Sequence, residues 1–197
     1  MAKARVMLAV VALGVLMTAP VRAQASGSRF AVEAAGSFGT LTGQDFEGTD
    51  ASAGFDAGAF VNLGSWQFGA GYARTAYGHE DAAGDFVVSS VFIEPRLRFG
   101  SESARWRPYL ATRIGRVSAS IDEPSTGGTI SVDGDGLLLG AAAGLLIDLA
   151  ASFQLALAAH VSFISVDYGG DSGFSSEEGG GQVGVRAGLR FNIPRRE

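Results

Sequence analysis

The chain of 197 residues contains no cysteine, which excludes a disulfide framework and a thiolate metal site. It has a single lysine, Lys3, and no cluster of basic residues of the kind that binds nucleic acid. After residue 25 no apolar stretch is long enough to cross a membrane as a helix, which takes about 20 residues. We therefore expect a single domain that binds no nucleic acid and contains no catalytic metal site or cofactor.

The first 25 residues have the features of a secretory signal peptide. Lys3 and Arg5 give a positive start, residues 6–17 are apolar, and Ala23 and Ala25 offer small residues for cleavage. The apolar stretch is too short for an anchoring transmembrane helix. We expect residues 1–25 to be removed, with cleavage after Ala23 or Ala25, leaving residues 26–197 as the folded domain.

The chain is rich in glycine, with 29 residues, and much of it follows a period of two. The pattern is clearest in residues 182–193, where valine, alanine, leucine, phenylalanine and isoleucine alternate with Gln182, Gly184, Arg186, Gly188 and Arg190. Such alternation predicts a β-strand with one apolar and one polar face. Because the polar face carries glycines and arginines, we interpret it as the lining of a confined polar interior.

Eight segments share this alternation: residues 30–38, 55–63, 66–72, 87–99, 106–115, 137–149, 153–163 and 182–193. Residues 137–149 are nearly all apolar and would also fit a helix, but their glycines fall on one face, as in the other segments. Strands of about 9–11 residues are long enough to cross a membrane when they are tilted. The pattern therefore favours membrane-crossing strands throughout.

The connections between these segments alternate between short and long. The long ones are residues 39–52, 77–84, 120–136 and 167–181. Short turns at one end and long loops at the other are typical of outer-membrane barrels, whose long loops face outward. We predict an all-β fold, an eight-stranded antiparallel up-and-down transmembrane β-barrel, with both termini periplasmic.

Aromatic residues support this orientation. Trp66, Phe99, Trp106 and Phe153 all lie beside the short turns. Aromatic girdles mark the boundaries of the membrane in such barrels. We expect these four side chains to form the periplasmic girdle.

Three motifs carry a resemblance to a known family: residues 92–99 (FIEPRLRF), 107–111 (RPYLA) and 188–194 (GLRFNIP). Residues 29–197 resemble the barrel domain of eight-stranded outer-membrane proteins of the OmpA/OmpX type. The sequence departs from the family pattern in two ways. It ends in PRRE, whereas the usual assembly signal of such barrels is a terminal phenylalanine, and no C-terminal peptidoglycan-binding domain of the OmpA kind is expected. The resemblance implies a monomer in the outer membrane of a Gram-negative-type envelope, with outer-membrane lipid and the barrel assembly machinery as partners.

The polar faces of the predicted strands carry charges of both signs. An eight-stranded barrel is only wide enough for side chains to fill, so charges there must pair or reach trapped water. We expect a lumen plugged by salt bridges, in which Glu94 lies diagonal to Arg113 and Tyr109; a narrow pore for ions or small solutes is the alternative. The expected lumen charges are Glu33, Asp56, Glu94, Arg96, Arg98, Arg113, Arg186 and Arg190, together with Arg107 and Asp148.

The predicted outer connections and their edges are acidic and hold neither lysine nor arginine. Residues 132–136 (VDGDG) resemble part of a calcium loop but lack the later bidentate glutamate of an EF-hand. Divalent cations or surface partners are therefore possible ligands of these loops. The acids are Asp45, Glu47, Asp50, Glu80, Asp81, Asp85, Asp122, Glu123, Asp133, Asp135, Asp167, Asp171, Glu177 and Glu178.

His160 and Ser162 share one strand face, which could bring a base near a nucleophile. Their spacing resembles the His-x-Ser of outer-membrane lipid A deacylases, but the orienting acid and flanking asparagines of that family are absent. The alternation places both residues inside the barrel, whereas that family's pair faces lipid. We expect a polar lumen pair and no catalytic residues.

Taken together, these features predict a non-enzymatic outer-membrane barrel with a plugged polar lumen and acidic extracellular loops. Its expected role is in envelope integrity or surface interaction. The alternatives are the porin-like narrow pore and a lipid-modifying enzyme. A soluble lipocalin-like barrel does not fit, because its apolar face would have to point inward.

Overall fold

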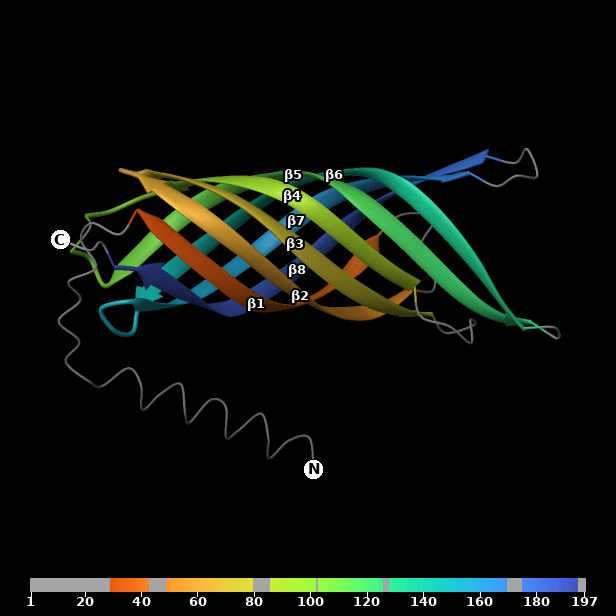
Figure 1. Ribbon diagram of the computed structural model, residues 1–197, viewed down its shortest axis with the longest axis horizontal. Helices are drawn as coiled ribbons and strands as arrows, with labels where there is room; N and C mark the ends of the chain where they lie inside the picture. Colours follow the sequence, from red (N-terminus) through yellow and green to blue (C-terminus); the bar gives the residue numbers. More distant parts are fainter. Residues whose placement is uncertain are drawn as a thin grey trace, which may run out of the picture.

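The computed structural model describes residues 29–42, 49–79, 86–101, 103–125, 128–169 and 175–194. They form one closed antiparallel sheet in which each strand pairs with its neighbours in sequence (Figure 1). The predicted eight-stranded up-and-down barrel is therefore confirmed. The strands are β1 (Phe30–Thr42), β2 (Thr49–Leu63), β3 (Trp66–His79), β4 (Phe86–Arg98), β5 (Trp106–Ser125), β6 (Gly128–Asp148), β7 (Phe153–Gly169) and β8 (Ser175–Ile193).

The barrel closes between its first and last strands. The β1–β8 ladder runs from Phe30 opposite Ile193 to Thr42 opposite Gly181, and β8 pairs with β7 on its other side. The predicted strand at residues 182–193 thus forms most of the closing strand. No helix long and apolar enough to cross a membrane occurs in the described ranges.

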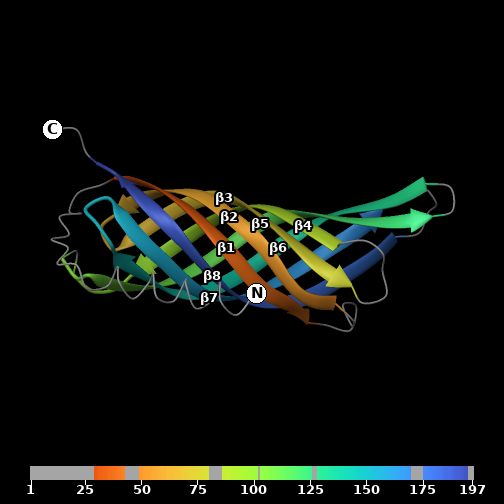
Figure 2. The same cartoon turned by 90° about the horizontal axis from the view of Figure 1, so that it is seen from below.

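The strands extend further than the alternation predicted. The β5–β6 hairpin stays paired as far as Ser125 opposite Gly128, so residues 120–136 are mainly strand and not a long loop. Likewise, β7 and β8 occupy most of residues 167–181. These two hairpins project farthest at the end opposite the short turns (Figures 1 and 2). The loop prediction was wrong there because backbone pairing continues after the outward side chains cease to be apolar.

The two faces of the strands follow the predicted alternation. Large apolar side chains point outward from all eight strands and are about half exposed; Leu137, for example, is 66% exposed and Val91 is 64% exposed. The polar side chains point inward and are buried. Glu94, for example, is 1% exposed and Arg190 is 0% exposed. An apolar exterior around a polar interior is the arrangement expected of a barrel surrounded by lipid tails.

The short turns lie at one end of the barrel, where Trp66, Phe99, Trp106 and Phe153 are exposed at its outer surface. Gly64 in the β2–β3 turn has φ of 60°, a conformation that glycine adopts without a Cβ clash. The turn places Leu63 opposite Trp66 and so sets the register of the whole β2–β3 pair.

Candidate functional site

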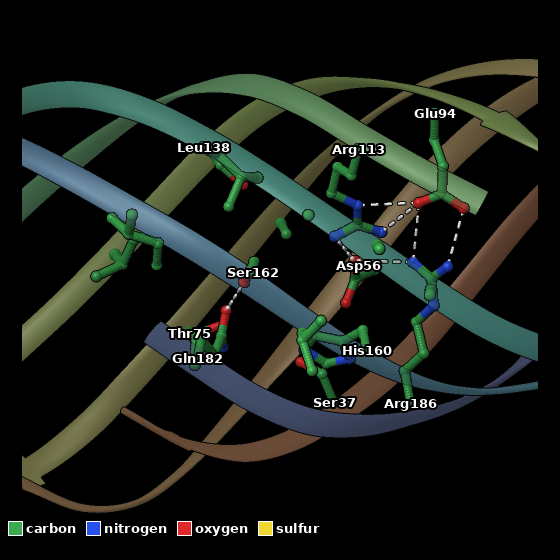
Figure 3. A pocket seen from close by; sticks show the side chains of 18 of the residues that line it. Ser37, Asp56, Thr75, Glu94, Arg113, Leu138, His160, Ser162, Gln182 and Arg186 are labelled. Atoms are coloured by element: carbon green, nitrogen blue, oxygen red, sulfur yellow. Dashed lines mark hydrogen bonds and ion pairs between the residues drawn. The ribbon is translucent and has the colours of Figure 1, made fainter. Parts of the chain in front are cut away.

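Glu94 is the centre of a buried charge network inside the barrel. Its side chain on β4 accepts hydrogen bonds from Arg96 Nε at 2.6 Å, Arg113 Nη2 at 2.7 Å and Arg186 Nη2 at 2.9 Å. Arg113 on β5 and Arg186 on β8 reach it from different sides of the lumen (Figure 3). Three guanidinium groups on one carboxylate compensate for the loss of water around it.

Two further carboxylates complete the network. Glu33 on β1 accepts two parallel hydrogen bonds from Arg96, at 2.7 and 2.8 Å, in the bidentate geometry that suits a guanidinium. Asp56 on β2 accepts a hydrogen bond from Arg113 Nη1 at 2.7 Å and lies 3.8 Å from Arg186 Nη1. The network thus ties β1, β2, β4, β5 and β8 together across the lumen.

Arg190 is the surplus cation, because the network contains four arginines and three carboxylates. Its Nη1 lies 3.5 Å from Glu33 Oε2, beyond ordinary hydrogen-bond distance. Side-chain amide oxygens supply its other acceptors, at 3.1, 3.2 and 3.4 Å, from Asn62, Gln67 and Asn192 respectively. Neutral amide dipoles therefore add to the attraction of Glu33 in stabilising the charge of Arg190.

A separate cluster connects β5, β6 and β7 near the short turns. Arg107 on β5 donates a hydrogen bond to Asp148 Oδ1 on β6, and Gln154 Nε2 on β7 donates to the same oxygen at 2.6 Å. All three side chains are buried. Arg98, which was also expected among the lumen charges, donates from Nη2 to the carbonyl of Gly64 in the β2–β3 turn.

The glycines of the inner face make room for aromatic rings. Phe60 lies across from Gly69, Phe92 across from Gly71, and Tyr109 across from Gly144. In each pair the ring occupies the space that a Cβ on the glycine would fill. A flat ring on a glycine shields the backbone that would otherwise lie bare.

The arginines stack on the free faces of these rings. The guanidinium carbon of Arg96 lies 3.9 Å from the centroid of Phe60 and 4.9 Å from that of Tyr109, and that of Arg113 lies 3.7 Å from Phe92. Each contact adds a cation–π attraction, which is stronger where the cation is desolvated. Glycine, ring and guanidinium therefore form layers that hold the charge network in one geometry.

Gly144→Ala is expected to lower the free energy of unfolding by about 1–3 kcal/mol, because the new methyl group overlaps the Tyr109 ring and forces a shift beneath Arg96. Gly36→Ala is the matched control, because a Cβ at this exposed position meets nothing within 4 Å. Urea titration of the folded barrel in lipid vesicles, followed by tryptophan fluorescence, measures both. Equal stability of the two variants would contradict the layered arrangement.

The half of the lumen farther from the short turns is lined mainly by apolar side chains. Between the charge network and the projecting hairpins, inward side chains pack into a buried cluster. The alternation did not predict this change, because a polar lumen was expected throughout. Its members are Leu41, Tyr77, Phe86, Val88, Phe92, Val117, Ala119, Leu138, Ile164 and Val166.

A chamber of about 50 Å³ lies between the charge network and the apolar cluster, lined by residues of both. His160, Ser162 and Gln182 face it together with Glu94 and others (Figure 3). A buried water needs roughly 10–15 Å³ of such space, so the chamber has room for a few. Within the described ranges, no group of acidic, histidine or cysteine side chains could hold a metal ion.

His160 and Ser162 share this chamber but form no dyad. The Ser162 hydroxyl donates to Gln182 Oε1 at 3.0 Å. Among the described residues, the Nδ1 atom of His160 has no hydrogen-bond partner. Both residues therefore line the lumen, where the alternation placed them.

The register of β4 and β5 differs from the prediction by two residues. Ile93 lies opposite Ile114 and Arg96 opposite Ala111. Between these pairs Glu94 therefore lies across from Arg113 and not diagonal to it. The predicted register was based on the length of the connection at residues 99–105. The observed pairing of β4 with β5 is shifted by two residues from the pairing that this length suggested.

Most of the predicted acidic residues lie outside the described side chains. Asp133, Asp135 and Asp167 are described, and all three point outward and are exposed on β6 and β7. Asp135 and Asp167 stand directly opposite each other. The predicted signal peptide also lies outside the described residues.

Several residues of the network were not singled out from the sequence. The amides Asn62, Gln67 and Asn192 bind Arg190, Gln154 binds Asp148 in the separate cluster, and Phe60 and Phe92 stack with arginines of the network. The position of Phe60 could have been predicted from the sequence, because the tight β2–β3 turn implies a strand register that places Phe60 opposite Gly69.

Comparison with known proteins shows similarity at the level of structure. No protein-family model matches the chain, and a search of curated proteins finds no match. Neisserial surface protein A (NspA) superimposes with a TM-score of 0.63 at 18% identity, covering 84% of this chain and 98% of that protein. OprG from Pseudomonas aeruginosa does so with a TM-score of 0.58 at 12% identity, covering 84% and 96%.

Ail, the attachment invasion locus protein of Yersinia pestis, matches with a TM-score of 0.50 at 19% identity, over 84% of this chain and 100% of that protein. At these identities the likeness concerns the fold. The predicted resemblance to small outer-membrane barrels is confirmed at that level. The chain has the fold of the eight-stranded outer-membrane β-barrels.

Proposed function

We propose that this chain is a non-enzymatic outer-membrane barrel whose lumen is closed to ions and solutes and whose outer hairpins contact surface partners. Its place in the membrane is supported by the apolar exterior, because a soluble protein does not expose large hydrophobic side chains on every strand. Its role is then to stabilise the envelope or to present the acidic outer segments at the cell surface.

The observation that carries the closed lumen is the arrangement around Glu94. Arginines from β4, β5 and β8 meet on this one carboxylate in the middle of the barrel, at distances of 2.6 to 2.9 Å. The apolar cluster beyond it adds a second barrier, since hydrophobic constrictions exclude water and ions. The two barriers lie in series, so the narrow-pore alternative requires both to open.

The enzyme alternative has little support. A base–nucleophile pair needs the two side chains within hydrogen-bond reach and a third group that orients the base. Ser162 is engaged by Gln182, and among the described residues no acceptor holds the Nδ1 atom of His160. We therefore assign both residues to the wall of the chamber.

We expect the wild-type protein to show no steady conductance in planar lipid bilayers. Both the Glu94 network and the apolar cluster occlude the lumen, so ions should have no continuous aqueous pathway through the barrel when a voltage is applied. Single-channel recording at 1 M salt is the measurement, with the empty bilayer as its control. Regular open channels would favour the narrow pore, and lipid A deacylation that disappears in His160→Ala would favour the enzyme.

A further inference from the structure

Two arginines interrupt the apolar exterior of the barrel. Arg74 on β3 and Arg116 on β5 both point outward and are exposed. From Trp106 to Arg116 the tilted strand β5 rises by about 25 Å along the barrel axis, which is the height of the apolar band of a membrane barrel. Arg116 therefore lies at the edge of that band farthest from the short turns.

Arg74 and Arg116 frame a small polar surface across β4. Arg74 stands opposite Ser89, Ser89 opposite Ser118, and Arg116 opposite Val91. From strand spacing and rise, the Cα atoms of the two arginines are about 12 Å apart, so their long side chains can reach one group between them. The Tyr72 hydroxyl donates to Ser89 Oγ at 3.1 Å within the same surface. We call Arg74, Arg116, Tyr72, Ser89 and Ser118 the arginine patch.

The two arginines of the patch differ from the lumen arginines in having no partner among the residues that the structure describes. Within the described residues neither Arg74 nor Arg116 forms an ion pair or a side-chain hydrogen bond, whereas Arg96, Arg113, Arg186 and the others of the lumen all do. Outward charges are tolerated near the edge of the apolar band, where they cost much less than at the middle of the membrane. Both guanidinium groups therefore remain available to a ligand at the level of the lipid headgroups.

The neighbouring sector of the same rim is acidic, beginning with Asp135 on β6, which lies directly opposite Ser118 of the arginine patch. Asp135 on β6 and Asp167 on β7 face each other across the strands, also outward and exposed. Like charges in this arrangement repel, and they repel anionic headgroups as well. A negatively charged lipid is therefore attracted by Arg74 and Arg116 over β3 to β5 and repelled by the acids that border this surface on β6 and β7.

We propose that the arginine patch binds the phosphate group of a phosphorylated lipid headgroup in the outer leaflet, an inference that rests on the proposed outer-membrane location. Guanidinium groups bind phosphate oxygens through paired hydrogen bonds, and the hydroxyls of Ser89 and Ser118 add donors beside them. The apolar side chains of Tyr72 and Val91 lie next along these strands and contact the acyl chains of the same lipid.

The test uses the full mature chain folded in phosphatidylcholine nanodiscs that contain bisphosphorylated lipid A. Native mass spectrometry measures the lipid A retained per barrel. The Arg74→Gln, Arg116→Gln double variant is expected to bind at least tenfold more weakly than wild type, while Asp135→Asn, Asp167→Asn binds at least as tightly as wild type, because it removes negative charge beside the patch. Lipid A with its phosphates removed should bind the wild type as weakly as the double variant binds the intact lipid.

Each other outcome overturns the proposal. Unchanged binding by the double arginine variant excludes the patch, and loss of binding in the aspartate variant with a requirement for Ca²⁺ assigns the lipid to the acidic sector. Competition by inorganic phosphate at equal concentration shows a site for the free ion. If the double variant does not fold, Arg74→Lys with Arg116→Lys replaces it and should weaken binding, because lysine lacks the paired donors.

Failure of this inference and failure of the proposed function give different results. A barrel that inserts into the nanodiscs and migrates differently before and after boiling, yet shows no preference for lipid A, contradicts only the arginine patch. A chain that does not insert in any lipid contradicts the membrane location itself.

Discussion

Replacing Glu94 by glutamine is expected to lower the free energy of unfolding by about 3–5 kcal/mol, because removing one side of a buried charge cluster leaves its partners uncompensated. Arg96, Arg113 and Arg186 all donate to this carboxylate. Glutamine retains the volume and one acceptor oxygen, so the effect reports the lost charge more than a cavity. No nearby carboxylate can take its place, since Glu33 and Asp56 already accept from Arg96 and Arg113.

The measurement is the temperature at which the folded barrel loses its resistance to SDS, followed by gel migration of samples heated stepwise. Asp167→Asn is the matched control: it also replaces an acid by its amide, but at an exposed position opposite Asp135, where the loss of a like charge costs nothing. If Glu94→Gln and Asp167→Asn melt at the same temperature, Glu94 is not the centre of the lumen network.

The second large effect is expected on the outside of the barrel. Ala143→Arg should cost about 2–4 kcal/mol, the range for an arginine at the middle of the lipid face of a barrel. Ala143 points outward on β6, between Leu110 on β5 and Ala159 on β7, far from either end of the apolar band. An arginine here must either draw headgroups and water inward or remain in hydrocarbon.

Urea titration in lipid vesicles, with tryptophan fluorescence as the signal, gives the free energy of this change. Ser118→Arg is the control, because Ser118 also points outward but lies beyond Arg116, where the cost should fall to about 0–1 kcal/mol. Gly140→Arg separates the two faces: it points into the lumen, with Ser162 Cβ 3.1 Å from its own added Cβ, and acts by overpacking. Equal tolerance of Ala143→Arg and Ser118→Arg would reject the assignment of the outer face to lipid.

The residue pattern by itself determines much of this protein's architecture. The alternation through residues such as Val183, Val185, Leu189 and Phe191 defined strands, faces and barrel class, because a period of two is a local property of extended backbone. The same alternation identified Glu33, Asp56, Glu94, Arg96, Arg113, Arg186 and Arg190 as inward-facing charges, and the structure brings these residues together.

The ends of the strands were predicted less well than their centres. Beyond Leu137 and Phe163 the outward positions turn polar, and this change resembles the start of a loop. The β5–β6 and β7–β8 ladders nevertheless continue, since each backbone finds its partner in the neighbouring strand whatever the side chains are. Outward polarity therefore marked the edge of the apolar band and not the end of the sheet.

Only the closed tertiary structure decided which charges meet. Glu33 and Arg96 are 63 positions apart, and Glu94 and Arg186 are 92 apart, so no local pattern relates them. Their distances depend on the register of all eight strands and on the tilt at which the sheet closes. A shift of two residues, such as that between β4 and β5, keeps every side chain on its face but changes its partner. The alternation thus determined what faces the lumen, and barrel closure determined the geometry in which those groups pair, the apolar cluster beyond them and the chamber between.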